Sequence, residues 1–365
     1  MTRERLSRAV AWLPPYQVLL AALGIAVGFV PGLPRLHLHS DVILAVFVPP
    51  LVFEAALNLD LRALASVIRP VVLLATLGVA ITIALVGGLA HYLLGLDWPA
   101  SLLLAAILSP TDPIAVVAVV RRSGAPAGLA ALLEGESLFN DGVGVVAFSI
   151  VLGAVAGANL TPIGIAGEFL LLALVGGAVG AAIGLTGAAV VRRTEFVPLE
   201  VLVTTLVAYG SYLTASALGA SGVMAVVVAG VVMARVGIWG PHTERWWARF
   251  AILLNVVLFT AIGIGLPGAS VVAAVGAVAG GFAILVAARL LLAYLPGLGI
   301  ANRWRQLLWW GGVRGALSVA LALAASERLA GSRVPAIAYG IVAVSLLLQG
   351  TVVRPAVRLL RLHRA

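Results

Sequence analysis

The chain has 365 residues, of which 62% are hydrophobic and only 10% are charged. A soluble domain carries about 25% charged residues, so the composition excludes an ordinary soluble fold, and it is far too hydrophobic for a disordered chain. All 23 basic side chains are arginine, and there is no cysteine for a disulfide framework or a thiolate metal site. The arginines lie in short gaps between apolar runs, a pattern that membrane topology explains better than nucleic-acid binding.

The apolar runs predict membrane-spanning helices. A bilayer crossing needs about 20 mostly apolar residues, and we expect about twelve crossings on that basis. The sequence therefore predicts an all-α polytopic membrane protein with a single transmembrane domain over residues 1–365. The predicted spans are 16–31, 41–57, 69–95, 98–121, 130–157, 163–191, 198–218, 220–236, 248–267, 270–296, 305–327 and 334–353.

The placement of arginine predicts the orientation. With an even number of spans, both termini lie on the same side of the membrane, and nearly all arginines lie on that side too. The exceptions are Arg35, Arg328 and Arg333 in opposite loops and Arg289 and Arg314 within spans. Because arginine-rich loops stay in the cytoplasm, we expect both termini to be cytoplasmic, in a bacterial plasma membrane.

Some ionisable side chains lie inside the predicted spans, where they are costly and by default indicate function. The acids are Glu54, Asp112, Glu136 and Asp141, and the bases are Arg289 and Arg314. Ion pairs that hold helices together are the alternative explanation. This alternative suits Glu136 with one arginine, but two bases do not neutralise four acids. The excess of acids therefore predicts an interior that holds a cation or protons.

The spacing of these groups predicts a shared site. Counting at about 1.5 Å per residue brings both Asp112 and Asp141 near the bilayer midplane. Ser137 and Asp141 are separated by one helical turn and share one stripe of the fifth span, while Glu136 and Asn140 form the adjacent stripe. A hydroxyl, carboxylates and an amide together offer the oxygen ligands that a hard cation such as Na⁺ needs.

Two of the predicted spans contain helix-breaking residues. Segment 108–113 has two prolines, which remove backbone donors, and the carbonyls freed at this depth need another partner. A simple proline kink is the alternative. In the second half, three glycines flank Arg314 within 310–316 and weaken the helix. One interrupted helix in each half is typical of inverted-repeat transporters with a site where the two cross.

Four ordered strings carry a family resemblance. They are FVPPLVFEAALNLD from Phe47, LSPTDPIA from Leu108, GESLFNDG from Gly135 and GGVRGALS from Gly311. In order and spacing they resemble the sodium/proton exchanger branch of the monovalent cation:proton antiporters, of the bacterial and archaeal type, over about residues 14–354. The resemblance implies a secondary active antiporter that exchanges Na⁺, or K⁺ or Li⁺, for H⁺ by alternating access.

The resemblance also implies a role for each polar residue. Asp141 would carry the cation and the proton in turn, and the Asn140-Asp141 pair is similar to that of the electroneutral branch, which exchanges one ion for one. The remaining ion-binding residues would be Asp112, Glu54, Ser137, Asn140 and the carbonyl of Thr111. The supporting residues would be a structural ion pair, Glu136 with Arg289, and Arg314 at the crossing helices.

The resemblance further implies a mobile core domain and a dimerisation side within a homodimer. The core would comprise about 69–157 and 270–353, the dimerisation side about 16–57 and 198–267, and the linker helix about 163–191. Thirteen-span members of the family have one more helix before the segment that matches 16–31. The expected partners are Na⁺ (or K⁺ or Li⁺), H⁺, membrane lipid and a second copy, with no cofactor and no nucleic acid.

A channel and a membrane enzyme are the alternatives to an antiporter. A cation channel or uniporter would use the same acids without proton coupling, but the sequence shows no repeated carbonyl filter. A membrane enzyme is not favoured, because Gly135-Glu136-Ser137 lacks the second glycine of a nucleophile elbow. ATP-driven transport by this chain alone is not favoured, since a phosphate-binding loop of the G-x-x-x-x-G-K type needs a lysine and the chain has none.

Overall fold

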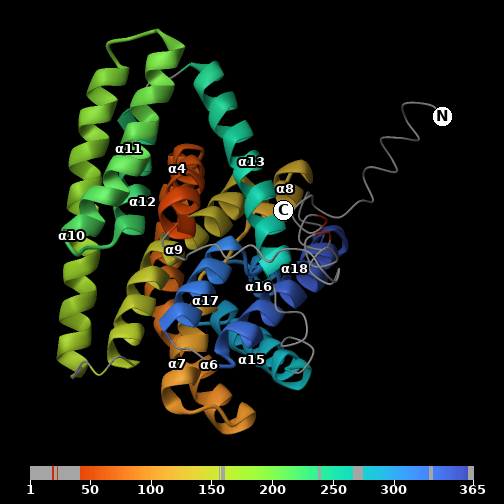
Figure 1. The fold of residues 1–365 in the computed structure, drawn as a ribbon. Helices are drawn as coiled ribbons and strands as arrows, with labels where there is room; N and C mark the ends of the chain where they lie inside the picture. Colours follow the sequence, from red (N-terminus) through yellow and green to blue (C-terminus); the bar gives the residue numbers. More distant parts are fainter. Residues whose placement is uncertain are drawn as a thin grey trace.

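The structure is a computed structural model that describes residues 42–155, 157, 161–236, 240–265, 274–328 and 332–360, together with Leu19 and Leu23. Within these residues the regular structure is helical and contains no strand, which confirms the predicted all-α class (Figure 1). The first half consists of η1 (Ile43–Phe47), α4 (Val48–Leu57), α5 (Leu61–Leu73), η2 (Leu74–Gly78), α6 (Val79–Leu94), α7 (Trp98–Ile107), α8 (Ile114–Arg122) and α9 (Ala127–Val155). The second half consists of α10 (Pro162–Val191), α11 (Val197–Ala217), α12 (Gly222–Val236), α13 (Pro241–Gly265), α15 (Val275–Ala293), α16 (Asn302–Trp310), α17 (Ala316–Arg328) and α18 (Val334–Leu359).

Each predicted span from 41–57 onward coincides with one helix or with an interrupted pair, and the span 16–31 lies outside the described residues. Among the described residues, 6 continuous helices are long and apolar enough to cross a membrane. They are Leu61–Leu94, Ala127–Val155, Ile163–Val191, Val197–Ala217, Val275–Ala293 and Val334–Val357. The exact number of crossings stays a prediction.

Two helices, α5 and α13, begin about two turns earlier than the apolar runs predicted. The third span was expected from residue 69, but α5 starts at Leu61, and α13 starts at Pro241 rather than at 248. Asp60 explains the first case, because its carboxylate accepts hydrogen bonds from the backbone N–H groups of Arg62 and Ala63 at 3.0 Å each. Such a cap satisfies free backbone donors in the first turn of a helix, so α5 begins before the apolar segment does.

Both predicted interruptions are present. Helix α7 ends at Ile107 and α8 resumes at Ile114, while α16 ends at Trp310 and α17 resumes at Ala316. The two non-helical segments meet, because the backbone N–H of Asp112 donates to the carbonyl of Val313 at 2.7 Å. A proline kink, the alternative for 108–113, is therefore wrong, although the inverted repeat itself stays a prediction.

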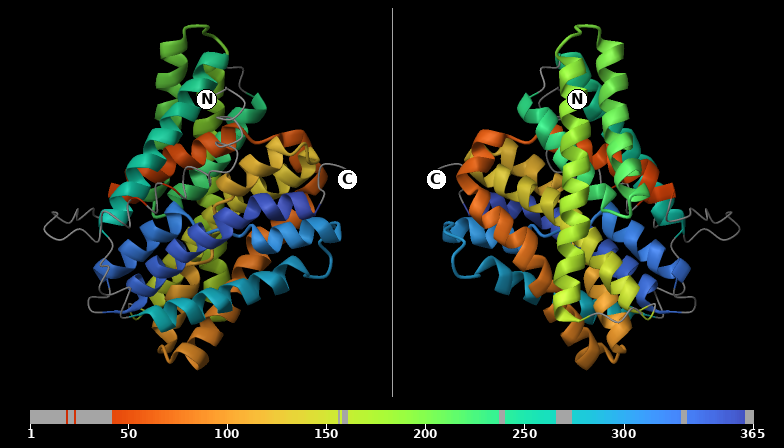
Figure 2. Two further views of the ribbon diagram at one scale, coloured as in Figure 1. Left: turned by 90° about the vertical axis from the view of Figure 1, so that its right-hand side faces the viewer. Right: turned by 90° about the vertical axis from the view of Figure 1, so that its left-hand side faces the viewer.

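The helices form two groups (Figures 1 and 2). In one group α10, α11, α12 and α4 pack together, and α10 meets α12 through glycines. A Cβ atom on Gly180 or Gly184 would collide with the backbone of α12, and one on Gly176 would collide with the backbone of Ser221 just before it. This is the close packing that small residues allow in membranes. The other group contains α5 to α9 and α15 to α18, and α9 contacts both groups.

Candidate functional site

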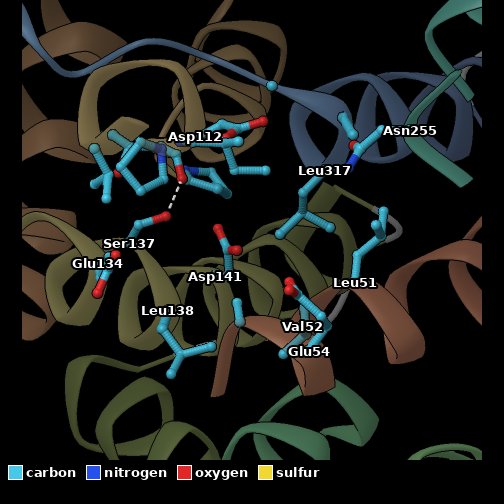
Figure 3. Close-up of a pocket in the computed structure, with 18 of the residues that line it drawn as sticks. Leu51, Val52, Glu54, Asp112, Glu134, Ser137, Leu138, Asp141, Asn255 and Leu317 are labelled. Carbon is cyan, nitrogen blue, oxygen red and sulfur yellow. Dashed lines mark hydrogen bonds between the residues drawn. The ribbon is translucent and has the colours of Figure 1, made fainter. Parts of the chain in front are cut away.

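A cavity of about 520 Å³ lies between the two groups of helices. Helices α4 and α13 form one wall, and the α7–α8 segment, α9 and α17 form the other (Figure 3). Its polar lining residues are Glu54, Asn58, Thr111, Asp112, Arg121, Glu134, Ser137, Asp141, Glu244, Asn255 and Ser318. Of the ionisable residues predicted inside spans, Glu54, Asp112 and Asp141 thus share one cavity.

The carboxylate of Asp141 points into the open centre of this cavity (Figure 3). No described residue forms a hydrogen bond or an ion pair with it. The carboxylate of Asp112 accepts one hydrogen bond, at 3.0 Å from the backbone N–H of Ile114. On the opposite wall, Glu54 accepts one at 2.7 Å from the side chain of Asn58. Among the described residues the one arginine that lines the cavity, Arg121, is paired with Glu134, so the carboxylates of Asp141, Asp112 and Glu54 are left without an ion pair and are suited to hold a cation or protons.

The interrupted segment beside these carboxylates is attached to α9 by three hydrogen bonds. The hydroxyl of Ser137 donates to the carbonyl of Thr111 at 2.5 Å. The side chain of Asn140 accepts from the backbone N–H of Thr111 at 3.2 Å and donates to its hydroxyl at 2.7 Å. Asn140 is 1% exposed and does not line the cavity. Its amide therefore faces the interrupted segment rather than the space where an ion would be held.

Arg314 supplies the donors that the interrupted segment needs. Its Nη1 donates to the carbonyls of Ser109 and Pro110, at 3.1 and 3.0 Å. These carbonyls follow the C-terminal end of α7, where the helix dipole is negative. The guanidinium group is 2% exposed and does not line the cavity. Arg314 thus stabilises the crossing of the two segments from inside the protein.

Glu136 and Arg289 form a bidentate ion pair with N···O distances of 2.9 and 2.8 Å. They are 3% and 5% exposed, and they connect α9 to α15. Glu136 also accepts a hydrogen bond from Asn140 at 2.9 Å, and Arg289 donates to the carbonyl of Leu308 at 3.1 Å. The pair is thus satisfied entirely by protein groups.

Several residues that contribute to the site were absent from the sequence-based prediction. Glu134 lines the cavity and forms a bidentate ion pair with Arg121, at 2.9 and 2.8 Å. Its position in the sequence could have revealed it, because it lies one turn before Ser137 and two turns before Asp141 on the same stripe of α9. Glu244 lines the same cavity from α13, and its position in a polar stretch carried no such signal.

Two further residues, on α18, support the second interruption. The hydroxyl of Ser345 accepts from the backbone N–H of Arg314 at 3.0 Å and donates to Gln349 at 2.5 Å. The amide of Gln349 in turn donates to the carbonyl of Trp310 at 3.1 Å. The spacing of one turn between these two polar residues in an apolar span is the sequence signal that could have identified them.

Comparison with known proteins agrees with this architecture. The family model described as "Sodium/hydrogen exchanger, transmembrane" matches residues 6–359. The Na⁺/H⁺ antiporter ApNhaP of Aphanothece halophytica is 35% identical, covering 95% of this chain and 70% of its own length. The Na⁺/H⁺ antiporter NhaP of Pseudomonas aeruginosa is also 35% identical, covering 87% of this chain and 81% of its own length.

A solved structure shows the same fold. The sodium proton antiporter MjNhaP1 from Methanocaldococcus jannaschii matches with a TM-score of 0.77, covering 95% of this chain and 92% of that one. The two sequences are 21% identical. The arrangement of the helices is thus preserved although about four residues in five differ.

Proposed function

The chain belongs to the sodium/hydrogen exchanger family of membrane transporters, and we propose that it exchanges Na⁺ for H⁺ across the plasma membrane. The observation that carries this proposal is the carboxylate of Asp141, which has no hydrogen-bond partner among the described residues and faces a cavity also lined by Asp112 and Glu54. Relatives with 35% identity are named as Na⁺/H⁺ antiporters. K⁺ and Li⁺ carry the same charge, and the test below distinguishes them from Na⁺.

A shared carboxylate site accounts for the exchange. Asp141 and Asp112 hold either a cation or protons, and one occupant excludes the other. Ser137 lies beside Asp141, and Glu54 completes the site from the opposite wall. If one cation moves for each proton, no net charge crosses the membrane. The membrane potential, worth about 2.3 kcal/mol per charge per 100 mV, then does not affect the rate.

The cavity lies between two walls of helices. Asn58, Arg121 and Glu244 line it near the ends of α4 and α8 and the start of α13, on the side for which the arginine pattern predicts the cytoplasm. We propose that the core, about 69–157 and 270–353, moves relative to 16–57 and 198–267 and exposes the carboxylates to each face in turn. Exposed leucines such as Leu171 and Leu206, on α10 and α11, are available to lipid or to the second copy of a homodimer.

The proposal is tested by proton movement in liposomes that contain the purified protein. Addition of Na⁺, and separately of K⁺ or Li⁺, is expected to drive proton release that is the same with the membrane potential clamped or free. Asp141→Asn retains the size of the side chain but cannot carry a proton or a charge, so it is expected to abolish this release. Cation flux without proton release would instead indicate a channel or uniporter, and flux that follows the potential would overturn one-for-one exchange.

A further inference from the structure

Two buried polar side chains line the cavity, and each has a hydrogen-bonding group without a partner among the described residues. Ser318 of α17 is 1% exposed, and its hydroxyl has no hydrogen-bond partner among the described residues. Asn255 of α13 is 3% exposed, and its amide nitrogen donates to the carbonyl of Ala251 at 3.0 Å. No described residue donates to its amide oxygen. An unpaired buried polar group is costly, so the hydroxyl of Ser318 indicates a partner beyond the described residues. The amide oxygen of Asn255 is open to the cavity and is available to the same partner.

Asn255 lies about three helical turns along α13 from Glu244, and Ser318 lines the same cavity from α17. Along α13 the lining residues run from Glu244 through Ala248 to Asn255 and Leu258. Along α4 they run from Asn58 back to Val48. Figure 3 shows Asn255 beside Leu317, the residue before Ser318, on the side of the cavity away from Glu134. An ion that enters beside Glu244 therefore reaches Asp141 before it reaches Asn255.

A small apolar cluster adjoins this end of the cavity, and we call it the apolar seal. Its buried members are Ile43, Phe47, Leu254, Leu258 and Ala320, and they form a cluster separate from the main core. Asn255 follows Leu254 directly, and Ser318 precedes Ala320 on the same helix. The two polar groups thus lie between the carboxylates and an apolar contact that joins α13 to η1 and α17.

We propose that Asn255 and Ser318 form a second, uncharged station for the transported cation, between the carboxylates and the membrane face that the apolar seal closes. The inference rests on the proposed function. Asn255 belongs to the same wall as Glu54, and Ser318 belongs to the same wall as Asp112. Each wall therefore contributes one residue to the station, and each also contributes to the carboxylate site. An amide oxygen and a hydroxyl replace part of a hydration shell without holding the ion as firmly as a carboxylate, which permits the ion to leave.

The position of the station makes its effect one-sided. A cation that arrives from the face of Arg121 and Glu244 reaches the carboxylates first, without passing the station. A cation from the opposite face passes Asn255 and Ser318 once the seal has opened. Loss of either polar group is therefore expected to weaken apparent cation affinity at the sealed face and to leave it unchanged at the open face.

The experiment measures the KM for Na⁺ separately at each face, in liposomes that contain Ser318→Ala, Asn255→Leu or both changes. Because the chain has no cysteine, Arg122→Cys in every variant gives one exposed thiol. In vesicles that hold one protein copy each, a membrane-impermeant biotin reagent labels only the copies with this face outward, and capture on avidin separates the two orientations. Loss of one hydrogen-bonding ligand is expected to raise KM at the sealed face about three- to tenfold. The double variant is expected to show the larger rise, and KM at the open face is expected to stay within error of the parent.

Ser211→Ala is the matched control. Ser211 is equally buried, but its hydroxyl donates to the carbonyl of Val207 at 2.6 Å, and it does not line the cavity. Its removal is expected to leave both KM values unchanged. Ser318→Ala removes a hydroxyl that has no partner among the described residues, so it is expected to fold at least as well as the parent, and a change in KM does not arise from unfolding.

The outcomes separate the station from the proposed function. Unchanged KM at the sealed face in Ser318→Ala and Asn255→Leu, or an equal rise at both faces, would overturn the station. If Asp141→Asn still abolishes exchange in the same liposomes, the proposed function stands without it. Sodium-driven proton release that survives Asp141→Asn would overturn the proposed function itself.

Discussion

Helix α9 carries two adjacent polar stripes that have the same kinds of side chain and different surroundings. On one stripe, Glu136 and Asn140 are fully buried, and their hydrogen bonds go to Arg289 and Thr111. On the other, Asp141 faces a cavity and no described residue bonds its carboxylate. Glu136 and Asp141 lie less than two turns apart on one helix and are thus suited to different roles. Glu136 is suited to hold helices together, and Asp141 is suited to bind a mobile ion.

The difference arises from the neighbours of each stripe. The first stripe faces α15 and the interrupted segment, which supply a guanidinium group and the hydrogen-bonding groups of Thr111. The second stripe faces α4 and α13 across a cavity. A buried charge with a complete set of partners is costly to disturb, whereas a carboxylate without partners is free to exchange its occupant.

Glu136→Gln is expected to have the largest effect on stability. It leaves Arg289 as an uncompensated buried charge, which costs about 3–5 kcal/mol, so folded yield and the unfolding midpoint in detergent are expected to fall sharply. Asp141→Asn is the matched control on the other stripe, and it is expected to keep a near-normal unfolding midpoint while exchange is lost. Normal stability of Glu136→Gln with altered transport would show that the structural role belongs to another group.

The pH dependence of cation affinity is expected to arise from the cavity-facing stripe. As the pH falls, protons occupy the carboxylates more often and the cation must displace them, so KM for Na⁺ is expected to rise by up to about tenfold per pH unit, or 1.4 kcal/mol. Transport rates measured over a range of pH and Na⁺ concentration check this slope. Ser149→Ala, a change at an exposed position of α9, is expected to leave it unaltered, and a KM independent of pH would contradict competition.

Ser137→Ala is expected to have a moderate effect. It removes the hydroxyl that donates to the carbonyl of Thr111, and one such hydrogen bond contributes about 1 kcal/mol. We expect KM for the cation to rise about fivefold, because the interrupted segment is held less firmly beside Asp141. Ser137→Thr retains the hydroxyl and is expected to recover most of the affinity. Equal KM values in Ser137→Ala and the parent would show that the remaining contacts of the segment, to Asn140 and Arg314, position it without Ser137.

Arg121→Gln is expected to have the smallest effect. The Arg121 side chain is 51% exposed in its pair with Glu134, and such pairs contribute less than about 1 kcal/mol to stability. Removal of the arginine leaves a more negative cavity lining, which is expected to lower KM for Na⁺ at low ionic strength and to have less effect at high salt. A KM shift that is independent of salt would contradict this electrostatic explanation.

The sequence by itself determined the membrane class, the helical elements and the two polar stripes. Apolar length and the one-turn spacing of Ser137 with Asp141 and of Glu136 with Asn140 are local properties, so they could be read without the fold. The prolines and glycines likewise located both helix interruptions. The resemblance to a known family supplied the pairing of Glu136 with Arg289, which local spacing does not contain.

Only the tertiary structure decided which groups each stripe meets. Asn140 bonds Thr111 and does not line the cavity, and the carbonyls of Ser109 and Pro110 accept hydrogen bonds from Arg314. Glu134 and Asn255 line the cavity. These outcomes depend on how α9 is rotated relative to α4, α13 and the interrupted segment. The physical reason is that a side chain's role in a membrane interior follows from its hydrogen-bond partners, and those partners come from helices far away in the sequence.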